Sequence, residues 1–341
     1  MLYKSSKNTR PVILFTDFKR QSYAMIGRLY KFSLESIGIN VDEIQTPHTA
    51  EERKKDGVSF QGRIILHNTI GPLFEPVPGA RNIALPAHEW SLYPDKWVEK
   101  LNRFDEVWVT TDHVYNTLKK SHVATPIHTL PPELDIDPVT EKNSWEPDGT
   151  FQFFSCGEPH FRKGFHLLME GFMRAFPEPG IAALTIKTSP ACGWKSPRDD
   201  IKIIAKNMTR NDVLVMYSKY DAYVSASLGE GLGLPVAEAI QALLPVATNY
   251  WGGHKSLLKE GAFWLINHDE VDQPYCSDPS YFASGQKCAF SHPDKIAQTL
   301  KAVAESSASE RKNRAVTARD NLLERYGEKA VRDRLKKHFG L

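Results

Sequence analysis

The residues best suited to chemistry stand in one glycine-rich segment, Ser227-Leu228-Gly229-Glu230-Gly231-Leu232-Gly233-Leu234-Pro235-Val236-Ala237-Glu238. Two carboxylates lie in it: Glu230 in a turn after a predicted strand, and Glu238 about one turn into the helix that Pro235 is expected to open. Glycines allow backbone N–H groups to approach an anion, and a helix N-terminus adds the positive end of its dipole. The segment therefore predicts a phosphate cradle made by the backbone of Gly231, Leu232, Gly233 and Leu234.

The two glutamates would repel phosphate groups, so their expected partners are sugar hydroxyls. A ligand that carries both phosphates and hydroxyls, such as a nucleotide sugar, fits this segment better than a bare phosphate does. The alternative is an ordinary strand-to-helix turn with incidental glutamates.

A second segment, Gly157-Glu158-Pro159-His160-Phe161-Arg162-Lys163-Gly164, also joins a predicted strand to a predicted helix. Arg162 and Lys163 at the start of that helix would place two cations on a diphosphate. Such a pair is usually just solvated. The functional interpretation gains weight because both segments follow strands of the same predicted lobe.

The elements that must position these residues are those of an α/β protein. Short β-branched or aromatic runs alternate with amphipathic stretches along the chain, as in strand-helix-strand units with parallel sheets. A chain of 341 residues is long enough for two domains. Residues 131–150 have the composition of a linker. We therefore expect an N-terminal domain at 1–140, a C-terminal domain at 141–324, and a last helix at about 325–341 that rejoins the first domain.

The same patterns predict the positions of the strands and helices. The strands are 11–16, 39–44, 63–67, 82–85, 106–110, 151–155, 183–187, 222–225, 246–249 and 263–266, and the named helices are 25–37, 114–120, 165–176, 292–306, 309–326 and 328–339. Basic and acidic side chains alternate in the last three helices, which favours a solvated, ion-paired face over a polyanion site.

The composition excludes a disordered, collagen-like or coiled-coil chain. Hydrophobic residues make up 41% and charged residues 25%, which is typical of folded globular chains. The net charge of +2 gives no overall field for nucleic acid or membrane. Lacking 18 consecutive apolar residues and a signal-peptide core, the chain is expected to be cytoplasmic, with a location peripheral to a membrane as the alternative. Its four cysteines are expected to be free thiols, with a Cys276–Cys288 pair as the minority interpretation.

Taken together, the motifs resemble the retaining glycosyltransferases of family 4. The resemblance covers about residues 60–270 and is carried by the Glu-x7-Glu spacing from Glu230 to Glu238, by Arg162-Lys163-Gly164, by Pro245-Val246-Ala247-Thr248 with Gly252-Gly253, and by N-terminal segments such as Leu85-Pro86-Ala87-His88-Glu89-Trp90. It implies the GT-B fold, in which two Rossmann-like, doubly wound parallel-sheet domains face a central cleft. It also implies transfer of a hexose or related sugar from a nucleotide-diphosphate donor to a hydroxyl acceptor, with retention and without an essential metal or cofactor.

The resemblance also assigns roles. Glu238 resembles the glutamate that binds ribose, Glu230 the one that contacts donor-sugar hydroxyls, and Lys163 the lysine on the diphosphate. Many relatives carry an arginine where this chain has Glu158, so we expect Arg162 to substitute for it. The pocket for the base is expected around Lys187, Leu214 and Val215, and UDP- or GDP-sugars are the expected donors.

The N-terminal lobe is less informative. His67 and His88 each end a predicted strand, and either is expected to contact the donor sugar or the acceptor, with a packed structural histidine as an equal alternative. Where relatives carry a glycine-rich turn, this chain has the loop Asp17–Met25, in which Lys19 or Arg20 would supply the charge. Glu89 is a further acceptor-side candidate. The Asp135-Ile136-Asp137 sequence resembles a manganese motif but lies in the linker, so no metal is expected.

Three functions stay open at this stage. A glycosyltransferase acting by front-face attack is favoured, with the acceptor proton passing to the departing phosphate. A degenerate binding or scaffold protein and a GT-B sugar-nucleotide epimerase or phosphorylase are the alternatives. The expected partners are the nucleotide sugar and a glycan, a lipid-linked saccharide or another hydroxylated acceptor. Residues 1–31 hold a basic excess that would suit an anionic acceptor, a membrane surface or modified nucleic acid, although a solvated face is the simpler interpretation.

Overall fold

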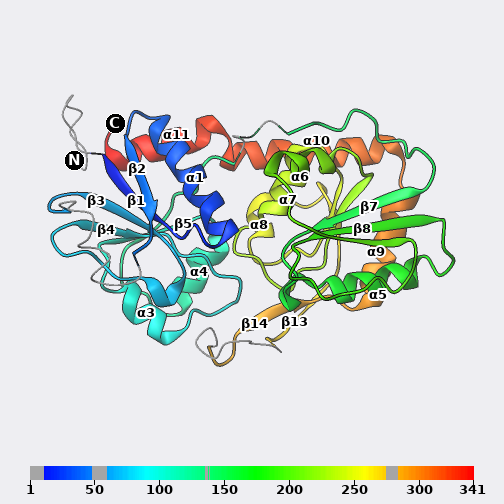
Figure 1. Ribbon diagram of the computed structural model, residues 1–341, viewed down its shortest axis with the longest axis horizontal. Coiled ribbons are helices and arrows are strands. Elements are labelled where there is room, and N and C mark those ends of the chain that lie inside the picture. Colours follow the sequence, from blue (N-terminus) through cyan, green and yellow to red (C-terminus); the bar gives the residue numbers. More distant parts are fainter. Residues whose placement is uncertain (1–10, 48–59, 135–136, 138, 274–282) are drawn as a thin grey trace. The chain divides into compact units, whose positions relative to one another are not determined.

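The computed structural model describes residues 11–47, 60–134, 137, 139–273 and 283–341. The chain divides into two compact units, which we call unit 1 (residues 1–136, 276–286 and 323–341) and unit 2 (residues 137–275 and 287–322). Each unit is built on one six-stranded sheet in which every paired strand runs parallel to its neighbour (Figure 1). The expected α/β class with two doubly wound parallel sheets is therefore confirmed.

The sheet of unit 1 has the strand order β2-β1-β3-β4-β5-β6. Its strands are β1 (Val12–Thr16), β2 (Val41–Gln45), β3 (Ile64–Asn68), β4 (Arg81–Ala84), β5 (Glu106–Val109) and β6 (Ile127–Thr129). Its helices are α1 (Gln21–Glu35), the short η1 (Gly71–Leu73), α3 (Asp95–Leu101), α4 (Asp112–Lys120) and α11 (Glu328–Phe339).

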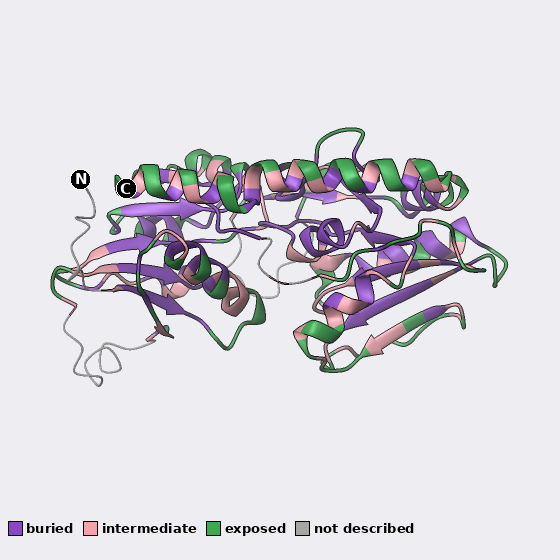
Figure 2. Ribbon diagram, turned by 90° about the horizontal axis from the view of Figure 1, so that it is seen from above, coloured by how far each residue is buried: buried purple, intermediate pink, exposed green. Residues whose placement is uncertain are grey.

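Helices cover both faces of this sheet, which explains why its strands read as continuous apolar runs. Successive side chains of a strand point to opposite faces. Leu14 of β1 accordingly packs in one core with residues of α1 and α11, whereas Ile13 and Phe15 belong to another. Figure 2 shows the strands of the sheets as largely buried.

The sheet of unit 2 has the strand order β12-β11-β10-β7-β8-β9. Its strands are β7 (Phe151–Cys156), β8 (Ala182–Thr188), β9 (Ile201–Ala205), β10 (Ala222–Ser225), β11 (Val246–Thr248) and β12 (Trp264–Leu265). The helices are η2 (Phe161–Lys163), α5 (Phe165–Ala175), α6 (Arg210–Tyr217), α7 (Leu234–Gln241), α8 (His254–Leu257) and α9 (Pro293–Glu305). A hairpin of β13 (Asp269–Asp272) and β14 (Lys287–Phe290) is antiparallel, and α10 (Ala308–Tyr326) spans the boundary between the residue ranges of the two units.

Some elements differ from those expected. The helix predicted from Met25 begins at Gln21 instead. Its first turn shows no apolar period, so the sequence pattern did not include it. The loop after β1 is therefore shorter than the predicted Asp17–Met25. The strands β6 and β9, the helix α3 and the β13–β14 hairpin were not predicted. Each is short, and β9 is only partly buried, so none leaves a clear periodic pattern.

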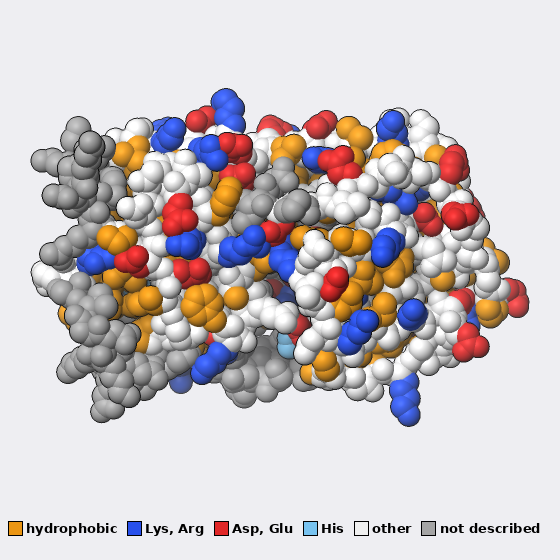
Figure 3. Space-filling model, turned by 45° about the horizontal axis from the view of Figure 1, so that its top comes forward, with side chains coloured by type: hydrophobic (Ala, Val, Ile, Leu, Met, Phe, Trp, Pro, Cys, Tyr) orange, Lys and Arg blue, Asp and Glu red, His pale blue; other side chains and the backbone are white. Residues whose placement is uncertain are grey.

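The basic run near the C-terminus is ion-paired, as expected. Arg314 Nη2 lies 2.8 Å from Glu310 Oε1, Lys329 Nζ lies 3.1 Å from Asp333 Oδ2, and Arg325 Nη1 lies 2.6 Å from Asp112 Oδ2. Figure 3 shows basic and acidic side chains interspersed over one face of the molecule. Among residues 11–31, Arg20 pairs with Asp17 and Lys31 pairs with Glu35; the basic residues at 1–10 lie outside the described residues.

Two further findings bear on the expectations. Cys156, Cys192 and Cys288 are free thiols among the described residues, whereas Cys276 lies outside them. Within the described ranges, every helix is too short or too polar to cross a bilayer.

Helix α11 is held to unit 1 by apolar packing, which gives a test of its importance. Leu335 is fully buried in the core that contains Leu14 and Tyr30. We predict that Leu335→Ala lowers the free energy of unfolding by about 2–5 kcal/mol, because it removes buried methyl groups and leaves a cavity. Urea denaturation measures the change, with the exposed Lys337→Ala as the control; equal stability of the two variants would contradict the observed packing.

Candidate functional site

The topology of unit 2 creates one place where loops separate. Strands β7 and β10 are hydrogen-bonded neighbours, but the chain continues from β7 through β8 to β9 on one side and from β10 through β11 to β12 on the other. At such a switch point the loops at the carboxyl ends of the strands diverge and leave a crevice for a ligand. The loop after β7 carries Arg162 and Lys163, and the loop after β10 carries Glu230.

Backbone hydrogen bonds join three loops at this edge of the sheet. The Leu228 N–H donates to the Arg162 carbonyl at 2.7 Å, and the Gly253 N–H donates to the Glu230 carbonyl at 2.7 Å. The Asn249 side chain donates to the Ser227 carbonyl, also at 2.7 Å. The loops after β7, β10 and β11 therefore form one connected structure.

Two glycines are required for this close approach. Gly164 has a φ of +65°, and a Cβ placed there would overlap the Ala226 carbonyl oxygen. A Cβ on Gly253 would lie 2.6 Å from the Gly231 carbonyl oxygen. Any larger residue at either position would push the loops apart.

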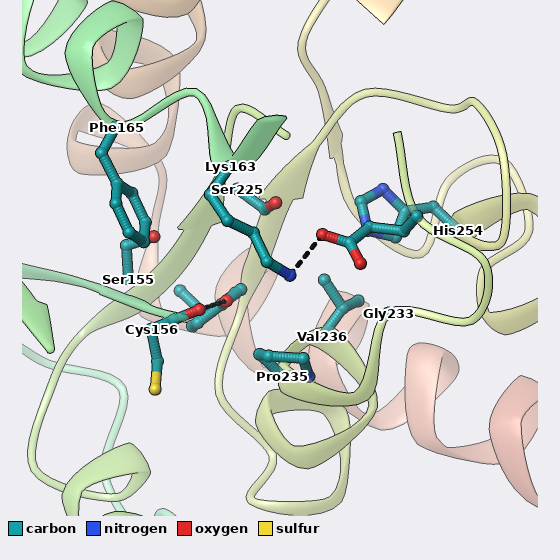
Figure 4. A pocket seen from close by; sticks show the side chains of 11 residues that line it. Ser155, Cys156, Lys163, Phe165, Ser225, Gly233, Pro235, Val236 and His254 are labelled. Atoms are coloured by element: carbon teal, nitrogen blue, oxygen red, sulfur yellow. Dashed lines mark hydrogen bonds and ion pairs between the residues drawn. The ribbon is translucent and has the colours of Figure 1, made fainter. Parts of the chain in front are cut away.

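The carboxylate of Glu230 lies at the centre of the site. Lys163 Nζ donates to Glu230 Oε1 at 2.6 Å, Ser227 Oγ donates to the same oxygen at 2.8 Å, and Arg162 Nη1 lies 3.1 Å from Oε2. A dashed line in Figure 4 marks the hydrogen bond from Lys163 to this carboxylate. Burial alone would raise the pKa of Glu230, but the charges of Lys163 and Arg162 outweigh it and hold the pKa well below its usual range.

His254 lies beside this ion-paired cluster. Its side chain is buried, and Nδ1 lies 3.3 Å from the Asn249 carbonyl oxygen and 3.1 Å from Thr248 Oγ1. Because a carbonyl oxygen only accepts, we assign the ring proton to Nδ1. Nε2 is then a buried acceptor without a hydrogen-bond partner among the described residues.

These residues line a small pocket. Its cavity volume is about 10 Å³, room for about one water molecule, and its lining includes Lys163, Glu230, Gly233 and His254. Cys156 also lines it, but burial raises the pKa of its thiol to about 12. That cysteine is therefore a neutral wall of the pocket and not a nucleophile.

Glu238 lies one turn into α7 and has partners of its own. Arg210 Nη1 donates to Glu238 Oε1 at 2.7 Å, and the Tyr217 hydroxyl donates to Oε2 at 2.7 Å. Burial, together with the charge of Glu238, raises the pKa of Tyr217 well above its usual value, so its hydroxyl keeps the proton. Arg210 Nε also donates to Asp137 Oδ2 at 2.7 Å. Asp137 is thus an ion-pair partner in the structure, whereas Asp135 and Ile136 lie outside the described residues.

The remaining predicted donor residues of unit 2 are distributed around this site. Gly231, Leu232 and Gly233 form the turn into α7, and Leu234 is its first helical residue. Lys187 lies near the end of β8, opposite Cys156 of β7, and its Nζ donates to the Thr188 carbonyl at 3.1 Å. Glu158 is half-buried in the loop after β7.

Both candidate histidines belong to unit 1 and are buried there. His67 Nε2 lies 2.9 Å from Asn82 Oδ1, and its ring packs edge-on against Phe15 and Phe104. His88 Nε2 lies 2.5 Å from the Leu92 carbonyl oxygen. These contacts account for both side chains as packed residues, so a catalytic role for either stays a prediction.

The other predicted residues of unit 1 lie in its loops. Arg20 pairs with the buried carboxylate of Asp17, and Lys19 is exposed beside it. Glu89 lies in the loop between β4 and α3. Their roles toward an acceptor or a phosphate likewise stay predictions.

Sequence reasoning missed four residues that complete the site. Ser227 and His254 stand within or beside motifs that the sequence analysis used, so their polar side chains were a usable signal. Arg210 and Tyr217 lie on a helix whose sequence shows no feature that links it to Glu238. Only the packing of α6 against α7 brings them there.

The buried histidine predicts a dependence of stability on pH. Burial lowers the pKa of His254 to about 4, below its ordinary value of 6.5, although Glu230 opposes the shift. Between these two values the unfolded chain binds a proton that the folded chain does not, so His254 contributes stability above pH 6.5 that is lost as the pH falls toward 4.

We therefore predict that His254→Gln loses less melting temperature than the wild type between pH 7 and pH 4. The expected difference is at least about 2 °C, the shift that 1 kcal/mol produces in a unit of this size. Calorimetric melting of both proteins across this range checks it, with the exposed His292→Gln as the control. Parallel pH profiles for wild type and His254→Gln would contradict the buried neutral state.

Comparison by sequence gives no assignment: no protein-family model matches the chain, and no curated protein matches it. Solved structures do match in fold. A variant of TarM from S. aureus, in complex with fondaparinux, alpha-GlcNAc-glycerol and UDP, is 13% identical with a TM-score of 0.61, covering 82% of this chain and 55% of that one. The pneumococcal O-GlcNAc transferase GtfA, in complex with UDP and GlcNAc, is 18% identical with a TM-score of 0.57, covering 81% and 56%.

A trehalose-6-phosphate synthase, studied for enzymatic glycosyltransfer with retention, is 12% identical with a TM-score of 0.59. The match covers 94% of this chain and 80% of that one. The chain thus spans little more than half the length of TarM and GtfA but most of the synthase. With two parallel six-stranded sheets and these neighbours, the chain has the GT-B fold.

Proposed function

We propose that this protein is a retaining glycosyltransferase of the family 4 type, which transfers a sugar from a nucleotide-diphosphate donor to a hydroxyl group. The observation that carries the proposal is the convergence of Lys163, Arg162 and Glu230 at the switch point of the unit 2 sheet. A donor of this kind brings two chemistries, an anionic diphosphate and a sugar with hydroxyls, and the site holds side chains suited to each.

Glu230 occupies the place of an anion in the structure. Its single negative charge is shared by both cations, whose side chains are largely buried, at 13% exposure for Lys163 and 20% for Arg162. Because a diphosphate carries more negative charge than one carboxylate, it is the stronger partner for this pair. In the proposed complex the diphosphate takes Lys163 and Arg162, and Glu230 turns to accept hydrogen bonds from the sugar.

His254 suits the sugar rather than the phosphate. Its Nε2 is an acceptor, and an ionised phosphate oxygen has no proton to donate. A sugar hydroxyl does have one. We therefore place His254 with Glu230 on the sugar side of the site, where a donated hydroxyl would satisfy a buried acceptor.

Glu238 is proposed to bind the ribose hydroxyls. Arg210 and Tyr217 each hold one carboxylate oxygen, and each oxygen has a further lone pair for a ribose hydroxyl. Arg210 and Tyr217 are thus positioning residues that fix the carboxylate before the donor arrives. Lys187 is proposed to border the base, in the neighbourhood of Leu214 and Val215 of α6.

The proposed reaction breaks the bond between the anomeric carbon and the phosphate oxygen and forms a bond to the acceptor oxygen on the same face. The acceptor proton passes to the departing phosphate. Lys163, Arg162 and the backbone amides of Gly231 to Leu234 stabilise the charge on the leaving group, where such preorganised donors contribute most. Retention is supported by the synthase of the same fold that was studied for glycosyltransfer with retention.

A UDP- or GDP-sugar is the proposed donor, since TarM and GtfA were both solved with UDP. No metal or cofactor is proposed for the transfer itself. The acceptor is proposed to be a glycan, a lipid-linked saccharide or another hydroxylated molecule, with His67, His88, Glu89, Lys19 and Arg20 of unit 1 as candidate contacts. A cytoplasmic location, peripheral to a membrane where the acceptor is lipid-linked, fits such a role.

One observation favours a second candidate function. The cavity beside Glu230 holds about one water molecule, and Glu230 already has three donors, so a binding protein that keeps a closed, inactive site fits this state as well. Nucleotide binding separates the two. We expect UDP or GDP to raise the melting temperature of the full chain, because a ligand that binds only the folded state stabilises it. Absence of a shift with uridine, guanosine, adenosine and thymidine diphosphates and their sugars would favour the inactive protein.

Glu230 gives the sharpest test of the catalytic site. We predict that Glu230→Gln lowers sugar transfer, or donor hydrolysis if no acceptor is known, by roughly a hundredfold or more, because the charged acceptor for the sugar is lost. Binding of the free nucleoside diphosphate is expected to persist or strengthen, since both cations lose their competing partner. The exposed Glu260→Gln is the matched control. Wild-type turnover in Glu230→Gln would refute the assignment.

Glu238 should affect binding rather than chemistry. We predict that Glu238→Gln raises KM for the donor roughly tenfold or more with a smaller change in kcat, because a hydrogen bond to a charged group contributes about 1.5–3 kcal/mol. Steady-state kinetics with donor varied at saturating acceptor measure both constants. Tyr217→Phe should give a smaller change in the same direction. A large fall in kcat at unchanged KM would place Glu238 at the reacting carbon instead.

A further inference from the structure

Three side chains of unit 1 lie close together and have no role in the proposed reaction. Glu106 begins β5, His128 lies in the neighbouring strand β6, and His338 lies in the last turn of α11. His338 Nε2 lies 3.0 Å and His128 Nε2 lies 3.9 Å from the same oxygen, Glu106 Oε2. The three possible ligand atoms all lie within 4.8 Å of one another.

This donor set has the chemistry of a transition-metal site. Two imidazole nitrogens and one carboxylate oxygen are ligands that Zn²⁺ takes in proteins, whereas Mg²⁺ and Ca²⁺ prefer oxygen ligands alone. The three ligand atoms would have to move only slightly closer to one another to bind one ion.

Neighbouring groups fix the carboxylate that would bind the metal. Trp108 Nε1 donates to Glu106 Oε2 at 2.9 Å, and Arg81 pairs with the other oxygen, Oε1. Such outer contacts orient a metal ligand and strengthen its binding. The guanidinium of Arg81 leaves Oε2 as the single metal-facing oxygen and disfavours hard cations held by charge alone. The C-terminal end of α11, beside His338, favours a positive charge.

The site is accessible from solvent. The side chain of Glu106 is 6% exposed, that of His338 13% and that of His128 40%. An ion bound beside the partly exposed His128 could also bind one or more water molecules, as in sites with three protein ligands.

We propose that Glu106, His128 and His338 form a zinc site that clamps α11 to strands β5 and β6. On binding, Zn²⁺ replaces the hydrogen bond between His338 and Glu106, and the proton on His338 Nε2 passes to Nδ1 or to solvent. The ion then links residues more than 200 positions apart in the chain and adds to the apolar contacts of Leu335 and Phe339. This site is independent of the proposed donor site in unit 2.

The test uses the full chain, freed of any histidine tag and dialysed against a chelator. Calorimetric titration with Zn²⁺ at pH 7.5 is expected to give one ion per chain, and Zn²⁺ is expected to raise the melting temperature, whereas Mg²⁺ at the same concentration gives no shift. Co²⁺ should produce the visible absorption of a site with nitrogen and oxygen ligands. Affinity should fall as the pH falls and protons compete for the histidines.

His128→Ala and His338→Ala should each lower the affinity for Zn²⁺ roughly tenfold or more, and His292→Ala, which changes an exposed histidine elsewhere, should leave it unchanged. Circular dichroism of the metal-free variants confirms that they are folded. If His338→Ala does not fold, His128→Ala alone decides, because its half-exposed side chain carries little of the packing. Absence of saturable Zn²⁺ binding, or equal binding by the His128→Ala variant, overturns the proposal.

Discussion

The site in unit 2 depends on one electrostatic arrangement, the buried carboxylate of Glu230 held between the cations of Lys163 and Arg162. A carboxylate with so little access to water is stable as an ion only when opposite charges lie beside it. The largely buried cations likewise need an anion beside them. Because the cations belong to the loop after β7 and the carboxylate to the loop after β10, the two loops must pack together. The hydrogen bond from the Leu228 N–H to the Arg162 carbonyl and the glycine at 164 allow that packing.

In our proposal, the ion pairs of Glu230 with Lys163 and Arg162 are the state of the site before a donor binds. In the structure Glu230 pairs with both cations, and the cavity beside it measures about 10 Å³. In the proposed function, a diphosphate would take over the ion pairs that Glu230 makes with Lys163 and Arg162. Because that exchange would replace one anion with a stronger one, phosphate binding and the release of Glu230 toward the sugar would be coupled. The same coupling would prevent Glu230 from acting before a donor is bound.

Glu238, in the helix that follows the Glu230 loop, is held differently. Its partners Arg210 and Tyr217 come from α6, and Arg210 is itself held by Asp137. None of these groups competes for the role that we propose for Glu238, because they hold the carboxylate from the side and each oxygen accepts more than one hydrogen bond. Glu230 is thus held by partners that a ligand would replace, and Glu238 by partners that a ligand would keep. Under the proposed function, two glutamates eight residues apart would obtain different roles from their neighbours and not from their own chemistry.

The sequence by itself determined the fold class and the principal chemical groups of the site. Alternating apolar runs and amphipathic stretches predicted the parallel sheets, and glycines beside Glu230, Arg162 and Lys163 marked two strand-to-helix turns, because these signals are local in the chain. The tertiary structure alone decided which groups meet. It brought Arg210 and Tyr217 to Glu238, placed His254 in the lining of the pocket with Glu230, packed His67 against Phe15 and Phe104, and joined Glu106, His128 and His338. These contacts connect distant segments through strand order and helix packing, and neither leaves a periodic or spacing signal in a single sequence.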